Sequence, residues 1–144
     1  MPDLNIRPYA VADEAAVIAL WARCDLIRPW NDPRKDIARK LRIQPDLFLV
    51  GFRGDELIAS VMAGYEGHRG WINYLAVSPE YQGFSYGRLM MEAAEARLRA
   101  LGCPKINLQV RESNAEVIAF YERLGYARDA VLSLGKRLEV DDTS

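Results

Sequence analysis

The chain has 144 residues, a length typical of one compact domain. Half of the residues are hydrophobic and 27% are charged, so the composition favours a globular protein and excludes a mostly disordered chain. The 19 lysines and arginines against 20 acidic residues supply no broad cationic surface for nucleic acid. We expect one domain over residues 1–144 with no nucleic-acid partner.

The N-terminal segment has no apolar stretch behind basic residues, and no apolar run is long enough to span a bilayer. These features predict a cytoplasmic protein with no membrane partner. Cys24 and Cys103 lie far apart and lack the Cys-x-x-Cys spacing of a zinc site. We therefore expect two core thiols, no disulfide framework and no metal.

The first part of the chain predicts one strand and two helices. A short alternating stretch at 4–7 predicts the strand, and apolar residues at helical spacing over 13–24 predict the first helix. Asp32-Pro33 is a typical helix start, because aspartate caps free amides and proline fits the first turn. This second helix is expected to end near Arg42.

Three β-prone segments follow, at 47–50, 57–62 and 71–77. The first two flank a turn-forming stretch at 53–55, so they predict a hairpin. The third strand follows a glycine-containing link. The sheet is therefore expected to begin as an antiparallel meander.

The second half of the chain alternates between helix and strand patterns. Apolar residues over 86–101 recur on one helical face, 105–110 alternates polar and apolar, and 113–124 starts with capping-box form. The apolar stretch 131–138 predicts one or two closing strand segments. The order β-α-α-β-β-β-α-β-α-β predicts an α/β (α+β) fold with a mixed central sheet.

The stretch 74–89 runs from a strand through a glycine-containing loop into a helix. Exposed amides at such a helix start carry partial positive charge and bind phosphate groups. Gly83 and Gly87 let the backbone approach a ligand, although two glycines in such a loop also serve simply to relieve strain. Neither Gly-x-Gly-x-x-Gly nor the lysine-containing end of a P-loop is present, so hydride transfer and nucleotide hydrolysis are weak interpretations.

The loop 82–87 resembles the acyl-CoA pyrophosphate loop of the GNAT superfamily of N-acetyltransferases, whose usual pattern is Arg/Gln-x-x-Gly-x-Gly/Ala. The segments 75–79 and 114–126 match that family's two central motifs in their usual order. The resemblance implies a GNAT fold with a V-shaped split between the fourth and fifth strands. Stretches that resemble the YpeA branch of bacterial acetyltransferases are 28–33, 67–70, 102–105 and 132–138.

The resemblance further implies that acetyl-CoA lies in this split as cosubstrate, with its pantetheine arm bonded to main-chain groups of the fourth strand. Asn114 is an implied contact, although a polar residue beside a capping Ser113 is also typical of any helix start. The implied contacts are Leu75, Ala76, Val77, Gln82, Gly83, Phe84, Ser85, Tyr86, Gly87, Arg88, Asn114 and Tyr121.

Ser85 stands where the family usually has its first loop glycine, and a serine does not freely adopt a positive φ. Two interpretations stay open. Either Ser85 has an ordinary helical conformation and its hydroxyl helps to bind phosphate, or the affinity for CoA is reduced. The other loop positions match the pattern, which favours retained binding.

Tyr121 matches the tyrosine that acts as general acid toward the thioester sulfur in similar proteins, although its spacing alone is that of a core tyrosine. Thiols have a pKa of about 8.5 and tyrosine one of about 10, so a hydrogen bond that strengthens as charge develops on sulfur is the better description. Glu66 and His68 are the nearest candidates for a general base, but residues of a glycine-flanked loop fit solvated turn positions better.

The loop 28–33 borders the acceptor site in similar enzymes. Trp30 is a candidate pocket wall, Asn31 a candidate contact, and Asp32 a candidate partner of a cationic amine as well as a helix cap. We predict acetyl transfer from acetyl-CoA to a primary amine by direct attack in a ternary complex. The alternatives are a peptide or protein N-terminal acetyltransferase similar to the ribosomal-protein type, and a non-catalytic acyl-CoA-binding module. A homodimer is also expected, because exposed edges of such sheets pair in relatives.

Overall fold

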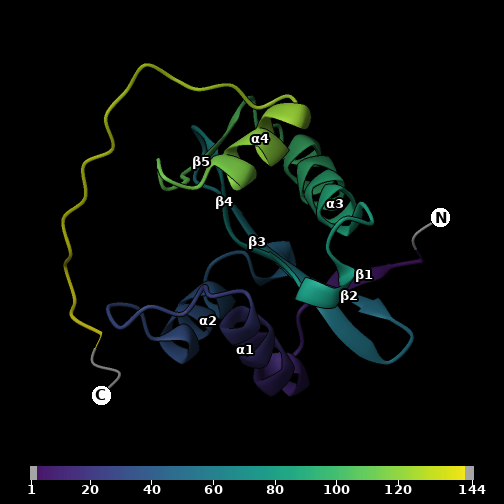
Figure 1. The fold of residues 1–144 in the computed structure, drawn as a ribbon. Helices are drawn as coiled ribbons and strands as arrows, with labels where there is room; N and C mark the ends of the chain where they lie inside the picture. Colours follow the sequence, from purple (N-terminus) through teal and green to yellow (C-terminus); the bar gives the residue numbers. More distant parts are fainter. Residues whose placement is uncertain (1–2, 142–144) are drawn as a thin grey trace.

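The computed structural model describes residues 3–141 as one mixed sheet between two pairs of helices (Figure 1). The strands are β1 (Asn5–Pro8), β2 (Phe48–Arg53), β3 (Glu56–Tyr65), β4 (Gly70–Val77) and β5 (Ile106–Leu108). The helices are α1 (Glu14–Arg23), α2 (Pro33–Leu41), α3 (Tyr86–Ala100) and α4 (Ala115–Arg123). Spatial order follows chain order, antiparallel from β1 to β4 and parallel between β4 and β5. The predicted α/β fold class is confirmed.

Each face of the sheet has its own hydrophobic core. On one face, α3 contributes Met90, Ala94 and Leu98, which recur at helical spacing and are fully buried. On the other face, α1 and α2 contribute Trp21 and Ile37. Burial on both faces explains why β2 and β3 have nearly continuous apolar sequences. No helix within residues 3–141 is long and apolar enough to cross a membrane.

Two helices begin at side-chain caps. The Oδ1 atom of Asp32 accepts a hydrogen bond from the Arg34 N–H at 2.9 Å, which confirms the predicted start of α2. The cap of α4 is Asn114, one residue later than the predicted Ser113. Its Oδ1 accepts from the Val117 N–H at 3.3 Å. Asn114 therefore has a structural role in addition to its predicted one.

The predicted closing strand at 131–138 is not present. Residues 131–140, which we call the C-terminal strap, form neither helix nor strand and run from beside α4 to beside α2, as the yellow trace in Figure 1 shows. Alternating apolar residues make a strand only where a neighbouring backbone pairs with them, and the sheet formed by residues 3–141 ends at β5. The side chains left 77–91% exposed are Val131, Leu132, Leu134, Leu138 and Val140.

The sheet divides at β4. Its pairing with β5 covers only the pairs from Gly70–Ile106 to Ile72–Leu108, whereas its other edge stays paired with β3 as far as Val77. The second half of β4 therefore has one edge that β5 does not cover. The predicted split between β4 and β5 is confirmed, and it opens toward the carboxyl end of β4.

Candidate active site

The start of α3 lies directly after the open end of the split. Unlike α2 and α4, α3 has no side chain that caps its first amides, and its first turn contains no acidic residue. The first N–H groups of a helix have no intrahelical acceptor, and residues 82–85 are exposed. This positive helix end is therefore open to an anionic group such as pyrophosphate.

The loop before α3 is tied to β4. The Gln82 Nε2 atom donates to the Val77 carbonyl oxygen at 3.0 Å. Gly83 and Ser85 both have left-handed backbones, with φ of 87° and 72°. Of the two interpretations of Ser85, the one with an ordinary helical conformation is wrong, since the serine itself adopts a positive φ. Gly87 has a packing role, because a Cβ at this position would lie 3.0 Å from the Phe120 ring. It allows α4 to pack close to α3.

Replacing Ser85 by glycine is expected to raise the free energy of unfolding by about 1 kcal/mol, because glycine has no steric penalty in the left-handed region. The dissociation constant for acetyl-CoA should change by less than about threefold, since the backbone already has the required geometry. Thermal unfolding and calorimetric titration test the two parts. Ser85→Ala is the control: it keeps the strain and removes the hydroxyl. A tenfold gain in affinity for the glycine variant would show that serine impairs the loop.

The edge of β4 that faces the split presents main-chain groups. The Ser78 N–H donates to Ile58 in β3, so the alternation of a strand directs the polar groups of Leu75 and Val77 to the opposite side. The Val77 carbonyl accepts from Gln82 and from the Cys24 thiol at 3.2 Å, and burial raises the pKa of that thiol. The groups that these bonds leave for a ligand are the Leu75 N–H and C=O and the Val77 N–H.

Tyr121 lies on α4, with its ring buried edge-on between Phe120 and Tyr126. Burial raises its pKa to about 12, so the hydroxyl stays protonated at neutral pH. This hydroxyl bonds to no group within residues 3–141, although no fully buried side-chain oxygen or nitrogen there lacks a partner. The Tyr121 oxygen therefore keeps some access to solvent or ligand, as a proton donor in a site requires.

Glu66 and His68 lie in the loop between β3 and β4. The Glu66 carboxylate accepts the N–H of His68 at 3.0 Å and also that of Arg69. The Gly70 N–H that follows donates to Lys105, so this loop adjoins the closed end of the β4–β5 pair. The structure thus gives Glu66 a turn-forming role and places both residues away from the open end of the split.

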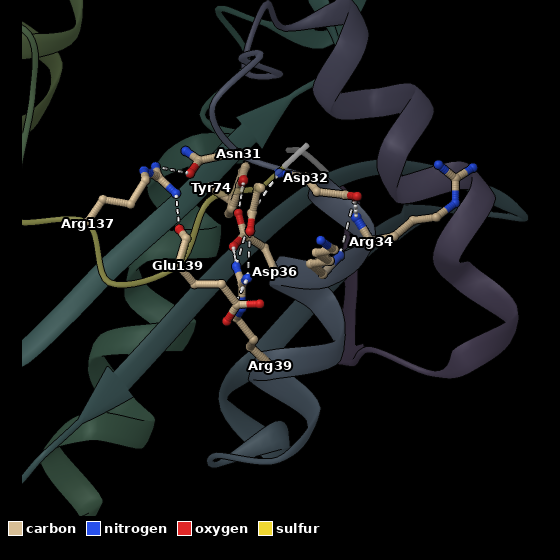
Figure 2. Close-up of polar contacts among 10 residues, drawn as sticks. Asn31, Asp32, Arg34, Asp36, Arg39, Tyr74, Arg137 and Glu139 are labelled. Carbon is tan, nitrogen blue, oxygen red and sulfur yellow. Dashed lines mark hydrogen bonds and ion pairs between the residues drawn. The ribbon is translucent and has the colours of Figure 1, made fainter. Parts of the chain in front are cut away.

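The loop between α1 and α2 carries the three predicted acceptor contacts. The Arg111 guanidinium, shortly after β5, lies 5.7 Å from the centre of the half-exposed Trp30 ring. Asn31 accepts a hydrogen bond from Arg137 at 3.0 Å (Figure 2). The Asp32 N–H donates to Asp141 at 3.0 Å. The loop therefore lies between the end of β5 and the C-terminal strap.

The sequence did not predict a polar cluster that lies beside this loop. This cluster joins Asp36 and Arg39 on α2 to Tyr74 on β4, as Figure 2 shows. Arg39 also joins the cluster to Asp141, directly after the strap. The spacing of Asp36 and Arg39 on one helix was visible in the sequence, but their distant partners were not. Within residues 3–141, no group of three or more histidine, cysteine, aspartate or glutamate residues is placed to hold a metal ion.

Known proteins are similar to this chain both in sequence and in fold. Residues 15–126 match the sequence model of the Acetyltransferase (GNAT) family. Acetyltransferase SG1711 of Sodalis glossinidius is 51% identical over 139 residues, covering 96% of this chain and 98% of that protein. Acetyltransferase ECA0875 of Pectobacterium atrosepticum is 50% identical over 138 residues, with the same coverage of 96% and 98%.

Among solved structures, the fold is similar to that of PaiA N-acetyltransferase from Thermoplasma acidophilum in complex with coenzyme A. The TM-score is 0.76 at 19% identity, over 90% of this chain and 93% of that chain. At this identity the likeness concerns the fold. The family assignment rests on the sequence matches.

Proposed function

The chain belongs to the GNAT family of acetyltransferases, and from that premise we propose that it transfers an acetyl group from acetyl-CoA to a primary amine by direct attack in a ternary complex. The observation that carries the proposal is the uncapped start of α3 at the open end of the split. One extended ligand can meet both a pyrophosphate-binding helix end and a free strand edge there. Acetyl-CoA would supply the acetyl group as a thioester.

The proposed contacts follow from this placement. The amides at the start of α3 and in the loop 82–88 bind the pyrophosphate, and the main chain of Leu75 and Val77 binds the pantetheine arm. Ala76 contributes no side chain to the split, since it is buried in the core against α1 and α2. Asn114 contributes from the start of α4.

The reaction forms a bond between the amine nitrogen and the acetyl carbon while the carbon–sulfur bond breaks. We assign the Tyr121 hydroxyl the hydrogen bond to the sulfur, which strengthens as negative charge develops there. The amine must also lose a proton, because an amine with a pKa of about 10.4 is neutral in only about one molecule in 2,500 at pH 7. Glu66 and His68 stay proposed bases that would act through water.

Thermal unfolding against a panel of CoA esters tests the cosubstrate. A ligand at about 100 times its dissociation constant stabilises the folded state by about 2.7 kcal/mol, so a clear rise in Tm is expected with acetyl-CoA. Thiol release with amines and peptides then identifies the acceptor. Release with peptides alone would favour an N-terminal acetyltransferase, and binding with no release a non-catalytic module. The absence of any shift would refute the proposal.

We also propose a homodimer in which two copies bury their C-terminal straps against each other. Five large apolar side chains within the ten residues of the strap are each at least 77% exposed, and such a concentration of exposed apolar residues is typical of an interaction surface. The neighbouring edge of β5 has no strand partner within residues 3–141. A two-fold axis would cover the same patch on both copies at once, as in the commonest class of symmetric protein assembly.

A further inference from the structure

The register between β3 and β4 slips by one residue at Tyr74. Met62 pairs with Asn73 and Ser60 with Ala76, so β4 has one extra residue, and Tyr74 has a φ of 53°. A bulky aromatic residue rarely adopts this conformation, and it persists only where the surrounding structure enforces it. Tyr74 directly precedes Leu75, whose N–H and C=O face the split. The conformation of Tyr74 therefore sets the direction of these groups.

Three contacts hold Tyr74. Its ring stacks on Trp21, with ring centres 3.8 Å apart and planes inclined by 11°. The Ser60 hydroxyl donates to the Tyr74 carbonyl at 2.9 Å and accepts from Trp21 Nε1 at 2.9 Å. The Tyr74 hydroxyl donates to Asp36 Oδ2 at 2.6 Å. The contacts with Trp21 and Ser60 lie within the core, whereas the bond to Asp36 connects Tyr74 to α2.

A line of charged groups continues from Asp36 through Arg39, both labelled in Figure 2, to Asp141 directly after the strap. Arg39 donates to Asp36 at 3.1 Å and to both carboxylate oxygens of Asp141, at 2.7 and 3.1 Å. The Asp141 side chain has no exposed surface and also accepts the N–H of Asp32. The bond to Arg39 holds the pKa of Asp141 well below its usual range, and burial together with Asp36 raises the pKa of Tyr74. Both groups therefore keep the protonation states that these bonds need.

We propose that Asp141 is a positioning residue, which acts through Arg39 and Asp36 to hold Tyr74 and thereby fixes the edge of β4 that receives acetyl-CoA. The inference rests on the proposed function for the identity of that ligand. It gives a role to the buried residue that directly follows the exposed strap. The contact links residues 102 positions apart in the sequence, so the chain end and the split are coupled through α2.

Two substitutions interrupt the line at its two ends. Asp141→Asn removes the charge that Arg39 binds, and Tyr74→Phe keeps the ring on Trp21 but removes the hydroxyl that bonds to Asp36. In the protein without ligand, the Ser78 N–H that donates to Ile58, and the Ala76 N–H on the same edge of β4, should exchange hydrogen about tenfold faster in each variant. The double variant should exchange no faster than either single one, because both break the same line.

Asp129→Asn is the matched control. Asp129 also lies near the C-terminal end, but it forms an exposed ion pair with Lys105 outside the cluster. Exchange at Ala76 and Ser78 should not change in this variant. Unchanged exchange in Asp141→Asn, or additive effects in the double variant, would overturn the inference.

Calorimetric titration with acetyl-CoA gives a second readout. Asp141→Asn and Tyr74→Phe should each weaken binding by about tenfold, and Asp129→Asn should not. Equal affinity of wild type and Asp141→Asn would overturn the positioning role while the proposed function stands. If wild type binds no acetyl-CoA but exchange responds as expected, the coupling is supported and the proposed function fails.

Discussion

Replacement of Tyr121 by phenylalanine is expected to lower the turnover number by about 100-fold. The substitution removes the one group that we place against the leaving sulfur and keeps the aromatic ring in the core. Binding of acetyl-CoA should change little, because the loop before α3 and the edge of β4 carry most proposed contacts. Steady-state kinetics with a saturating amine, together with calorimetric titration of acetyl-CoA, measures both quantities.

Tyr126→Phe is the matched control for this prediction. Tyr126 packs edge-on against Tyr121, but its hydroxyl donates to Glu95 at 2.6 Å. Its loss should cost about 1–2 kcal/mol of stability and leave turnover almost unchanged. Tyr121→Phe should show the reverse, because its hydroxyl has no partner within residues 3–141. Equal losses of turnover and cofactor binding in Tyr121→Phe would identify Tyr121 as a packing residue.

The pH dependence of turnover gives an independent test of the same role. A tyrosine acts as a hydrogen-bond donor only while it is protonated, and burial raises the pKa of Tyr121 to about 12. A raised pKa extends the range of the protonated form upward. Turnover should therefore show no loss from ionisation of Tyr121 below about pH 11.

Local signals in the sequence predicted most of the fold. Helical spacing identified α1 and α3, and Asp32 with Pro33 identified the start of α2, because these features depend on neighbours a few residues away. The strap shows the limit of such signals. Its apolar alternation is typical of a strand, but pairing depends on a distant backbone that residues 3–141 do not provide.

The candidate site shows the same division. The loop 82–87 was recognisable, since its glycines and its place between strand and helix are properties of contiguous sequence. The left-handed backbone of Tyr74 was not, because it is enforced by Trp21, Ser60 and Asp36 from three other elements. Contacts over such separations leave no pattern in a single sequence. They carry the coupling between the strap and β4.

A charge in the strap is expected to separate the proposed dimer. Leu134 and Leu138 are each 91% exposed in the single chain, so aspartate at either position should cost the folded monomer little. In the dimer the same substitution would bury a charge among apolar side chains. Each variant should therefore weaken association by about 30-fold or more, as measured by sedimentation velocity over a range of concentrations.

Val11→Asp is the matched control, because Val11 is 75% exposed and lies in the short helical turn 11–13 that packs against the start of α1 rather than against the strap. The control variant should form the dimer as strongly as wild type does. Chemical cross-linking identifies the surface itself: a link between Lys136 of one copy and Lys136 of the other can form only between molecules. The proposed two-fold contact predicts that link in wild type and its loss in Leu134→Asp. A wild type that sediments as a monomer at every concentration would contradict the contact and leave the strap exposed in solution.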